Sequence, residues 1–244
     1  MPQEELQILY EDREILVCVK PPGVPVQSDR TGAYDLTNRL LNYLAVSGST
    51  AQIPYLAVIH RLDRPVGGVM VFAKTKKAAA ELSRQVQERT MTKRYYCVLT
   101  GVKTDRERQQ KEEPSEWENI TGYLVADKQK NSSRMVELPQ AGAKKAELRV
   151  RLLEWRETVL AEVELLTGRH HQIRVQMTCI SEGIWGDTKY NSAFTGKKGW
   201  FELALFSCHL AFTHPSSGKR MQFEALPEGD AFERFAYIQR LRER

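Results

Sequence analysis

The sequence predicts an α+β fold, with one large, mainly antiparallel mixed sheet and a few flanking helices. Short apolar runs bounded by glycine, proline or charged turns recur along the chain, as expected for sheet strands. Between residues 117 and 166 every apolar run is of this kind, and the last two are joined by a tight turn near Arg156. Helical spacing of apolar residues is confined to a few separate segments.

The N-terminal segment predicts two strands and a helix. Residues 7–19 form two short apolar runs, and Pro21 and Pro22 end the second strand (15–19) and begin an extended loop. In residues 35–44 leucines recur at helical spacing, and Asp35 is placed to cap that helix.

The next segment predicts two apolar strands joined by a charged corner. The strands cover residues 56–59 and 69–73, and a Pro-Val-Gly-Gly sequence leads into the second one. Residues 76–89 then predict an amphipathic helix, and residues 90–100 return to strand character.

The second half of the chain predicts mostly strands. It begins with a polar connection at residues 103–116, which has charges of both signs and no apolar periodicity. A helix is expected over residues 170–177 and another near the C-terminus, where Phe232, Phe235, Ile238 and Leu241 recur about once per turn. The predicted strands are residues 122–126, 134–138, 146–155, 158–166, 203–212 and 221–224.

Composition and charge describe an ordinary globular protein. Of the 244 residues 41% are hydrophobic, and 36 basic against 31 acidic residues give a net charge of +5. This mild excess permits a nucleic-acid partner without requiring one. The four cysteines are widely separated, with no C-x-x-C pair, so neither a zinc site nor a disulfide framework is expected. The acidic N-terminus lacks an apolar signal core, and we expect a cytoplasmic monomer without a membrane span.

The corner before the second apolar strand is unusual in its charges. His60, Arg61, Asp63 and Arg64 lie within five positions, beside strands too apolar to be exposed on both faces. A carboxylate at such an edge is partly desolvated and needs a basic partner, and this environment tunes a side chain for chemistry. A solvated turn with an incidental ion pair is the simpler interpretation.

Three stretches of the chain carry distinctive motifs. They are HRLDRPVGGVMVFAKT from His60, TKRYYCVLTG from Thr92 and LLTGRHHQIRVQM from Leu165. In the same order, they resemble the catalytic-loop motif, the K-x-Y strand motif and the G-R-x-H-Q-I-R-V block of the RluA-type RNA pseudouridine synthases. The resemblance extends from about residue 6 to residue 235, and it implies a synthase core formed by one domain (1–244) with two halves joined near residues 102–118.

The resemblance implies a cofactor-independent isomerase that converts uridine in ribosomal or transfer RNA to pseudouridine. Asp63 would be its essential catalyst, Tyr95 would contact the uracil, and Arg174 would hold Asp63 by a directional guanidinium–carboxylate pair. A tyrosine that packs in the sheet and an exposed helical arginine are the alternative interpretations of the last two residues. Addition to the sugar, addition to the base and removal of a ribose proton are all open to Asp63.

An RNA substrate implies further contacts. Arg61 would occupy the space that the uridine vacates when it leaves its stack. Basic residues of 76–94 and the pair Lys197-Lys198 are candidate phosphate contacts. The other predicted substrate-binding residues are His60, Arg64, Lys93, Arg169, His171 and, in the pocket wall, Leu205 or Leu203.

Four features depart from the pattern of the family. Val66-Gly67 replace a common Thr-Ser pair, and His170 replaces a commonly small or hydroxyl residue. The loop at residues 183–190 resembles a G-x-P-I-x-G-D-x-x-Y loop but is shorter and lacks the proline. The chain also starts too close to the catalytic core for a separate S4-type RNA-binding domain, so recognition would fall to the core and its loops.

Two other functions fit part of the same sequence. One is an inactive RNA-binding protein with the same fold, and the other is a hydrolase or nuclease that uses His60, Asp63 and His171. Adjacent histidines on a helix point about 100° apart, so His170 and His171 are not expected to bind one metal ion. The sequence also has no H-E-x-x-H spacing, Walker loop or dinucleotide fingerprint, and the reaction that the resemblance implies needs no cofactor, so neither a metal nor a cofactor is predicted.

Overall fold

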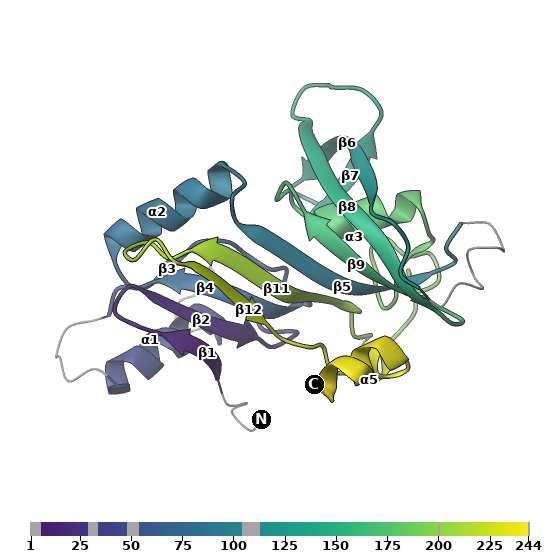
Figure 1. Ribbon diagram of the computed structural model, residues 1–244. Helices are drawn as coiled ribbons and strands as arrows, with labels where there is room; N and C mark the ends of the chain where they lie inside the picture. Colours follow the sequence, from purple (N-terminus) through teal and green to yellow (C-terminus); the bar gives the residue numbers. More distant parts are fainter. Residues whose placement is uncertain (1–5, 29–33, 48–53, 104–112, 200, 244) are drawn as a thin grey trace. The chain divides into compact units, whose positions relative to one another are not determined.

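Two compact units make up this computed structural model, which describes residues 6–28, 34–47, 54–103, 113–199 and 201–243 (Figure 1). Unit 1 consists of Met1–Thr92 and Ser207–Ala225, and unit 2 of Lys93–Phe206 and Leu226–Arg244. The chain therefore passes between the units three times, and none of these passages lies in the predicted junction at residues 102–118. A single catalytic domain stays a prediction.

The strands of unit 1 follow the order β1-β2-β4-β11-β12, and β3 pairs with β4 outside this path. Strands β1 and β2 form an antiparallel hairpin, and β2 pairs with β4 without interruption from Ile15↔Ala73 to Lys20↔Gly68. This register places the beginning of β4 beside the end of β2, where the Lys-Pro-Pro-Gly loop starts. The strands are β1 (Gln7–Glu11), β2 (Ile15–Lys20), β3 (Ala57–Val58), β4 (Gly67–Ala73), β11 (Leu205–Thr213) and β12 (Arg220–Glu224).

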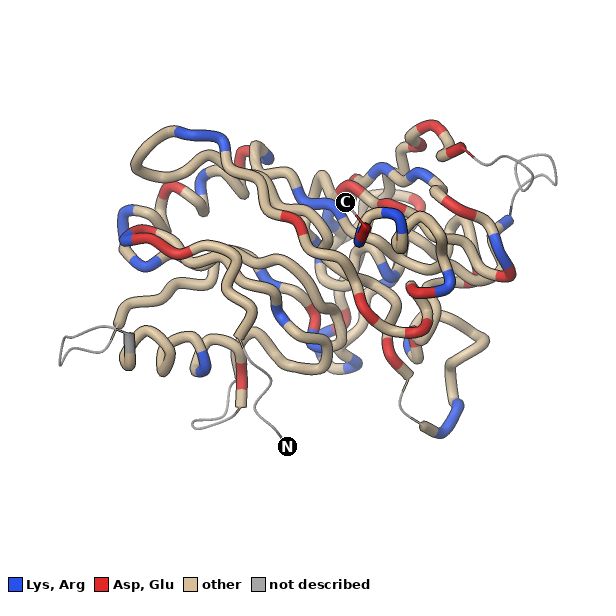
Figure 2. The backbone as a smooth tube through the Cα atoms, turned by 60° about the horizontal axis from the view of Figure 1, so that its bottom comes forward, with Lys and Arg blue, Asp and Glu red and all other residues tan. Residues whose placement is uncertain are grey.

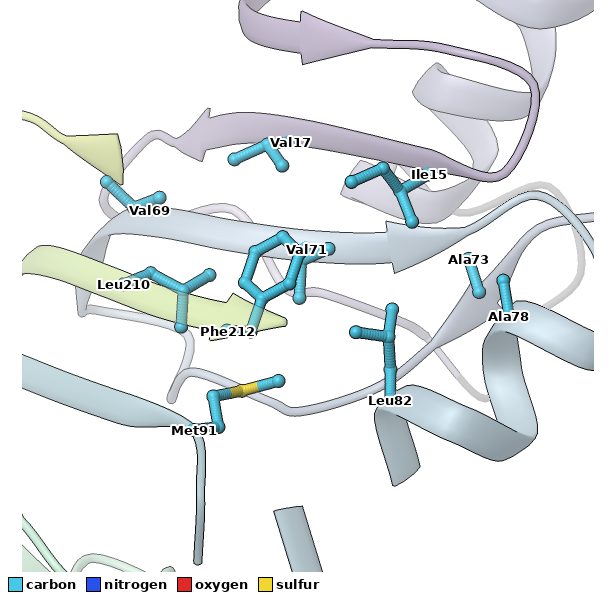
Figure 3. Packing of buried hydrophobic residues seen from close by; sticks show 10 residues of the cluster. All are labelled: Ile15, Val17, Val69, Val71, Ala73, Ala78, Leu82, Met91, Leu210 and Phe212. Atoms are coloured by element: carbon cyan, nitrogen blue, oxygen red, sulfur yellow. The ribbon is translucent and has the colours of Figure 1, made fainter. Parts of the chain in front are cut away.

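A helix covers each face of this sheet. Alternate residues of β2 and β4, such as Val17 and Val71, pack against α2 (Lys76–Gln87) through Ala78 and Leu82 (Figure 3). The intervening residues point to the opposite face and are buried too. Burial raises the pKa of one of them, Cys18, to about 12, and the nearby positive charge of Arg39 in α1 (Leu36–Ser47) opposes this effect. Both faces of β2 and β4 are therefore buried, which accounts for their continuous apolar sequence.

Both predicted helices of unit 1 are confirmed, together with the cap that the sequence indicated. The side chain of Asp35 accepts a hydrogen bond from the amide of Asn38 at 2.8 Å, before α1. Thr75 caps α2 in the same manner, accepting from the amide of Ala78 at 3.1 Å.

Glycine is required at the corner where the charged loop enters β4. Gly68 has φ +123, a conformation that is strained for residues with a side chain. A Cβ atom at this position would lie 2.3 Å from the backbone oxygen of Ser207 in β11. The second glycine of the Pro-Val-Gly-Gly sequence therefore allows β4 and β11 to approach closely.

Unit 2 contains a second run of antiparallel strands, in the order β5-β9-β8-β6-β7, with β10 paired to β5. The hairpin predicted near Arg156 is confirmed as β8 and β9, and a bulge lies between Leu152 and Glu154. The strands are β5 (Thr92–Thr100), β6 (Glu118–Asp127), β7 (Ser132–Val136), β8 (Lys144–Trp155), β9 (Val159–Leu165) and the short β10 (Gly183–Ile184), which sequence analysis missed.

The helix expected over residues 170–177 is much shorter. The α-helix α3 covers Gln172–Gln176, and the 3₁₀ turn η2 covers Met177–Cys179. His171 stands before α3 with φ 53, in the left-handed region, so neither His170 nor His171 is helical. The helical argument against a shared metal ion was therefore wrong in its premise.

The expected C-terminal helix is split in two. Helices α4 (Asp230–Glu233) and α5 (Ala236–Arg242) are separated by an extended Phe235. The carboxylate of Glu154 in β8 accepts the amides of Ala236 at 3.3 Å and Tyr237 at 2.7 Å, and so caps α5 from a distant strand. The break between α4 and α5 is therefore stabilised by a tertiary contact, which the spacing of apolar residues in the sequence does not reveal.

None of the four cysteines, all of which lie within the described residues, forms a disulfide bond, and Cys18, Cys97 and Cys208 are buried whereas Cys179 is exposed. No helix within the described residues is both long and apolar enough to cross a membrane.

Candidate functional site

Asp63 lies at a sharp turn in the loop between β3 and β4, in unit 1. The amide of Val66 donates to the carbonyl of Asp63 at 3.0 Å and closes this turn. Leu62 and Val66, on either side, are buried, while Arg61 and Arg64 are exposed and Asp63 is half-buried. The buried side chains of Leu62 and Val66 thus fix the backbone of the loop, and the Asp63 side chain extends from a rigid backbone.

The side chain of Lys20 holds this loop in place by hydrogen bonds. Its side chain is fully buried, and its Nζ donates to the carbonyls of Pro21 at 2.9 Å, Val24 at 2.7 Å and Arg64 at 3.1 Å. Arg64 is also held by Gly23, whose amide donates to its carbonyl and whose carbonyl accepts from its Nε, each at 2.9 Å. The loop of Asp63 is therefore tied to the loop that follows β2. Burial lowers the pKa of Lys20 to about 7, although the charge of Asp63 opposes this effect.

The contribution of Lys20 to stability is expected to increase with pH. Its folded-state pKa is about 7 against an ordinary value of 10.5, so between these limits the unfolded chain binds more protons. The stabilisation is complete above the ordinary pKa and is lost as the pH falls towards 7. Urea unfolding of the wild type and of Lys20→Met at pH 7 and at pH 9.5 measures this contribution. The difference in the free energy of unfolding between the two proteins should grow by up to about 1.4 kcal/mol per pH unit. An equal difference at both pH values would contradict this assignment.

His60 has a structural contact within unit 1. The amide of Val71 donates to its Nε2 at 3.3 Å, one position beyond the last β3–β4 pair. Its imidazole thus continues the ladder where β3 ends, and the ring carries its proton on Nδ1. The predicted substrate contact of His60 stays a prediction.

Tyr95 and Lys93 share one face of β5 in unit 2. Both are buried, and burial lowers the pKa of Lys93. Tyr96 points to the other face, where its ring lies edge-on to that of Tyr237 in α5, with centroids 6.2 Å apart. Packing thus accounts for Tyr96, and the motif residue Tyr95 lies on the opposite face. Leu205, like Leu203, is buried.

Arg174 is fixed by Asp187 in unit 2. Its Nε and Nη2 donate to the two carboxylate oxygens of Asp187, each at 2.8 Å, and both side chains are almost completely buried. Oδ1 of Asp187 also accepts the amides of Lys189 at 2.9 Å and Tyr190 at 3.1 Å. The carboxylate therefore both orients the guanidinium and shapes the 183–190 loop. The expected pair of Arg174 with Asp63 joins residues of the two units and stays a prediction.

Tyr190 connects Arg174 to His171. The guanidinium of Arg174 lies 5.1 Å from the centroid of the Tyr190 ring, and the Tyr190 hydroxyl lies 2.7 Å from Nδ1 of His171. That hydroxyl accepts the amide of Ser133 at 2.8 Å, so its own proton is available to Nδ1. Burial first, and then the charge of Arg174, lower the pKa of His171 to about 3. His171 is therefore a neutral residue that carries its proton on Nε2.

Sequence reasoning missed two residues of this cluster, Asp187 and Tyr190. Both lie in the G-D-x-x-Y sequence of the 183–190 loop, which was compared with the family but given no role. A buried arginine such as Arg174 requires a carboxylate partner, and the aspartate of the G-D-x-x-Y sequence, Asp187, could have been proposed as that partner from the sequence.

The glutamines of α3 hold the cluster on the sheet. Gln172 accepts the hydroxyl of Thr167 at 2.8 Å and donates to the carbonyl of Glu147 at 3.1 Å. Gln176 donates to the carbonyls of Ile120 and Ala146, at 3.1 and 3.3 Å. These contacts attach the short helix to β6 and β8, so Arg174 and His171 start from a fixed backbone.

The predicted site residues are thus divided between the units. His60, Arg61, Asp63 and Arg64 belong to unit 1, and Lys93, Tyr95, Arg169, His171, Arg174 and Leu205 belong to unit 2. Among the described residues, no group of three or more His, Cys, Asp or Glu side chains is arranged to hold a metal ion. Lysines and arginines are interspersed with acidic residues along the chain (Figure 2), in keeping with the modest net charge.

Comparison with known proteins identifies the family. The family model described as "RNA pseudouridylate synthase" matches residues 14–178. "Ribosomal large subunit pseudouridine synthase D" of Zymomonas mobilis is 32% identical over 90% of this chain and 68% of its own length. "Ribosomal large subunit pseudouridine synthase C" of Vibrio vulnificus is 29% identical over 94% of this chain and 69% of its own. This chain spans 58% to 69% of the length of such curated relatives.

A solved structure shares the fold. "Human RNA Pseudouridylate Synthase Domain Containing 4" superposes with a TM-score of 0.71 over 97% of this chain and 93% of that one, at 22% identity. The predicted α+β fold with a mainly antiparallel sheet is therefore confirmed. The family match contains all three motifs of the sequence, and the chain belongs to the RluA-type RNA pseudouridine synthases, a family of isomerases.

Proposed function

We propose that this protein converts uridine to pseudouridine in RNA, with Asp63 as its catalytic residue. The observation that carries the proposal is the family match over residues 14–178, which contains Asp63, Tyr95 and Arg174 at their motif positions. The local structure of the Asp63 loop supports it, since the turn is anchored by Lys20 and the side chain is half-buried. A fixed, partly desolvated carboxylate suits chemistry better than a mobile one does.

The reaction requires few groups. The N1–C1′ bond of uridine breaks, the uracil turns, and a C5–C1′ bond forms, while C5 loses a proton and N1 gains one. Atoms and electrons balance within the substrate, so a carboxylate and local proton transfers suffice. We assign Asp63 to the junction of ribose and base, Tyr95 to the uracil, and Arg174 to the support of the catalytic carboxylate.

The proposed substrate is ribosomal RNA of the large subunit. The names of the relatives in Zymomonas mobilis and Vibrio vulnificus support this choice over transfer RNA. A uridine in a stacked RNA has to be extruded before its ribose–base bond is accessible. Arg61 is exposed on the Asp63 loop, and we assign it to the space that the uridine leaves.

Pseudouridine mapping tests this function in cells that express the protein. Total RNA is compared between the parent strain, a deletion strain, and the deletion strain complemented with the wild-type gene. We expect one or more positions of large-subunit ribosomal RNA to lose pseudouridine on deletion and to regain it on complementation. Loss confined to transfer RNA would contradict the proposed substrate, and an unchanged map would contradict the proposed activity.

A further inference from the structure

His170 presents an aromatic ring that is exposed and yet held at both nitrogens. Its Nδ1 lies 3.0 Å from Oγ of Ser133, and its Nε2 lies 3.1 Å from Oδ1 of Asn131. The hydroxyl of Ser133 donates its one proton to the backbone carbonyl of His170 at 2.8 Å, so it acts as the acceptor towards Nδ1. The ring is therefore fixed to the β6–β7 hairpin, although a surface side chain is ordinarily free to rotate.

The ring of His171 lies beneath that of His170. The two rings are stacked, with centroids 3.8 Å apart and an interplanar angle of 23°. His171 is itself buried and held by the Tyr190 hydroxyl, in a left-handed backbone conformation with φ 53. Residues kept in such strained conformations cluster at functional sites. One face of His170 is thus covered by a fixed ring, while the side chain as a whole remains exposed to solvent.

Basic residues lie in the segments next to this ring. The turn of the β6–β7 hairpin carries Lys128 and Lys130, both exposed. Lys189 of the 183–190 loop donates to the carbonyl of Asn131 at 2.6 Å, which places its charge at the same turn. Arg169 directly precedes the ring, and its Nε donates to the carbonyl of Lys145 at 2.9 Å. The acidic residue in the turn, Asp127, accepts the amide of Lys130 at 3.0 Å.

We propose that His170 is a stacking platform for an unpaired nucleotide of the RNA substrate. An exposed planar ring that is held in place, with basic residues in the adjoining turn and loop, suits the π-face of a base and the phosphates on either side of it. The inference rests on the proposed function for the identity of the RNA. Stacking accepts any base, so the platform would add affinity for the RNA without a sequence requirement of its own.

Binding of a fluorescently labelled single-stranded oligouridine dodecamer tests the platform. His170→Ser is expected to raise the Kd about tenfold to a hundredfold, whereas His170→Phe, which keeps an aromatic face, should stay within about threefold of the wild type. His170 is exposed and lies outside the α3 helix, so the fold should be retained. Gln129→Ala, an exposed change in the same hairpin turn, is the matched control and should bind like the wild type.

Salt dependence separates stacking on a base from the neutralisation of phosphates. His170→Ser should leave the slope of log Kd against log salt unchanged, because the ring contacts a base. Lys128→Ala and Lys130→Ala should each reduce the slope by about 0.7 for every phosphate that the lysine neutralises. A wild-type Kd for His170→Ser, or a Kd for His170→Phe as weak as that of His170→Ser, would overturn the platform, since the ring would then serve only to fasten the hairpin.

A turnover assay keeps this inference distinct from the proposed function. With a large-subunit ribosomal RNA transcript as substrate, His170→Ser should raise KM and leave kcat within about threefold of the wild type. A wild type without turnover would contradict the proposed function and leave the oligonucleotide result standing. An active wild type that His170→Ser matches in both Kd and KM would contradict the platform alone.

Discussion

Asp63→Asn is expected to lower the rate of pseudouridine formation by at least about a thousandfold, because an amide cannot act as a nucleophile or as a base. The fold should be retained, since the two side chains have the same shape and the turn is closed by the backbone carbonyl of Asp63. The charge of Asp63 does raise the pKa of Lys20, so the variant should lower that pKa further. This effect concerns stability and leaves the chemical argument unchanged.

Release of tritium from RNA labelled at C5 of uridine measures this loss, because the C5 hydrogen leaves when the new bond forms. Glu88→Gln is the matched control, since it removes one carboxylate from the exposed end of α2 in the same unit. The control should turn over at the wild-type rate. If Asp63→Asn kept activity within about tenfold of the wild type, an essential role of Asp63 in bond cleavage would be ruled out.

Local signals explain why much of the fold could be predicted. The apolar runs of β2 and β4 are local features of the chain, and they predicted both strands directly. Asp35 and the leucines after it predicted α1 because a cap and a helical period are properties of neighbouring residues. The motif residues Asp63, Tyr95 and Arg174 were found by resemblance to the family. A resemblance identifies the positions of such residues in the sequence, but it does not show which residues they contact.

The remaining features depend on contacts between residues distant in sequence. The C-terminal helix is split because Glu154, in β8, caps α5 in a way that residues 230–242 do not reveal. His171 has a left-handed backbone conformation and a hydrogen bond to the hydroxyl of Tyr190, so the helix begins only after it and has five residues. The partner of Arg174 within unit 2, Asp187, comes from a loop whose path the sequence did not predict.

Asp187→Asn is expected to cost about 3–5 kcal/mol of the free energy of unfolding, because it leaves the buried charge of Arg174 without its carboxylate. Arg174→Lys keeps the charge but loses the bidentate geometry, and should cost about 1.5–3 kcal/mol. Urea unfolding followed by tryptophan fluorescence measures both values. A cost below about 1 kcal/mol for Asp187→Asn would show that the pair contributes no more than a surface salt bridge.

A double variant separates the structural role of Arg174 from its role in the reaction. Arg174→Met combined with Asp187→Asn removes both buried charges, and the asparagine Oδ1 still accepts the amides of Lys189 and Tyr190. Because replacing a buried ion pair by neutral groups is often close to neutral in stability, the double variant should regain most of the stability that Asp187→Asn loses. Its turnover should nevertheless stay low if Arg174 supports the catalytic carboxylate. Recovery of both stability and turnover would instead limit Arg174 to holding the 183–190 loop in place, and another basic residue would then have to support Asp63.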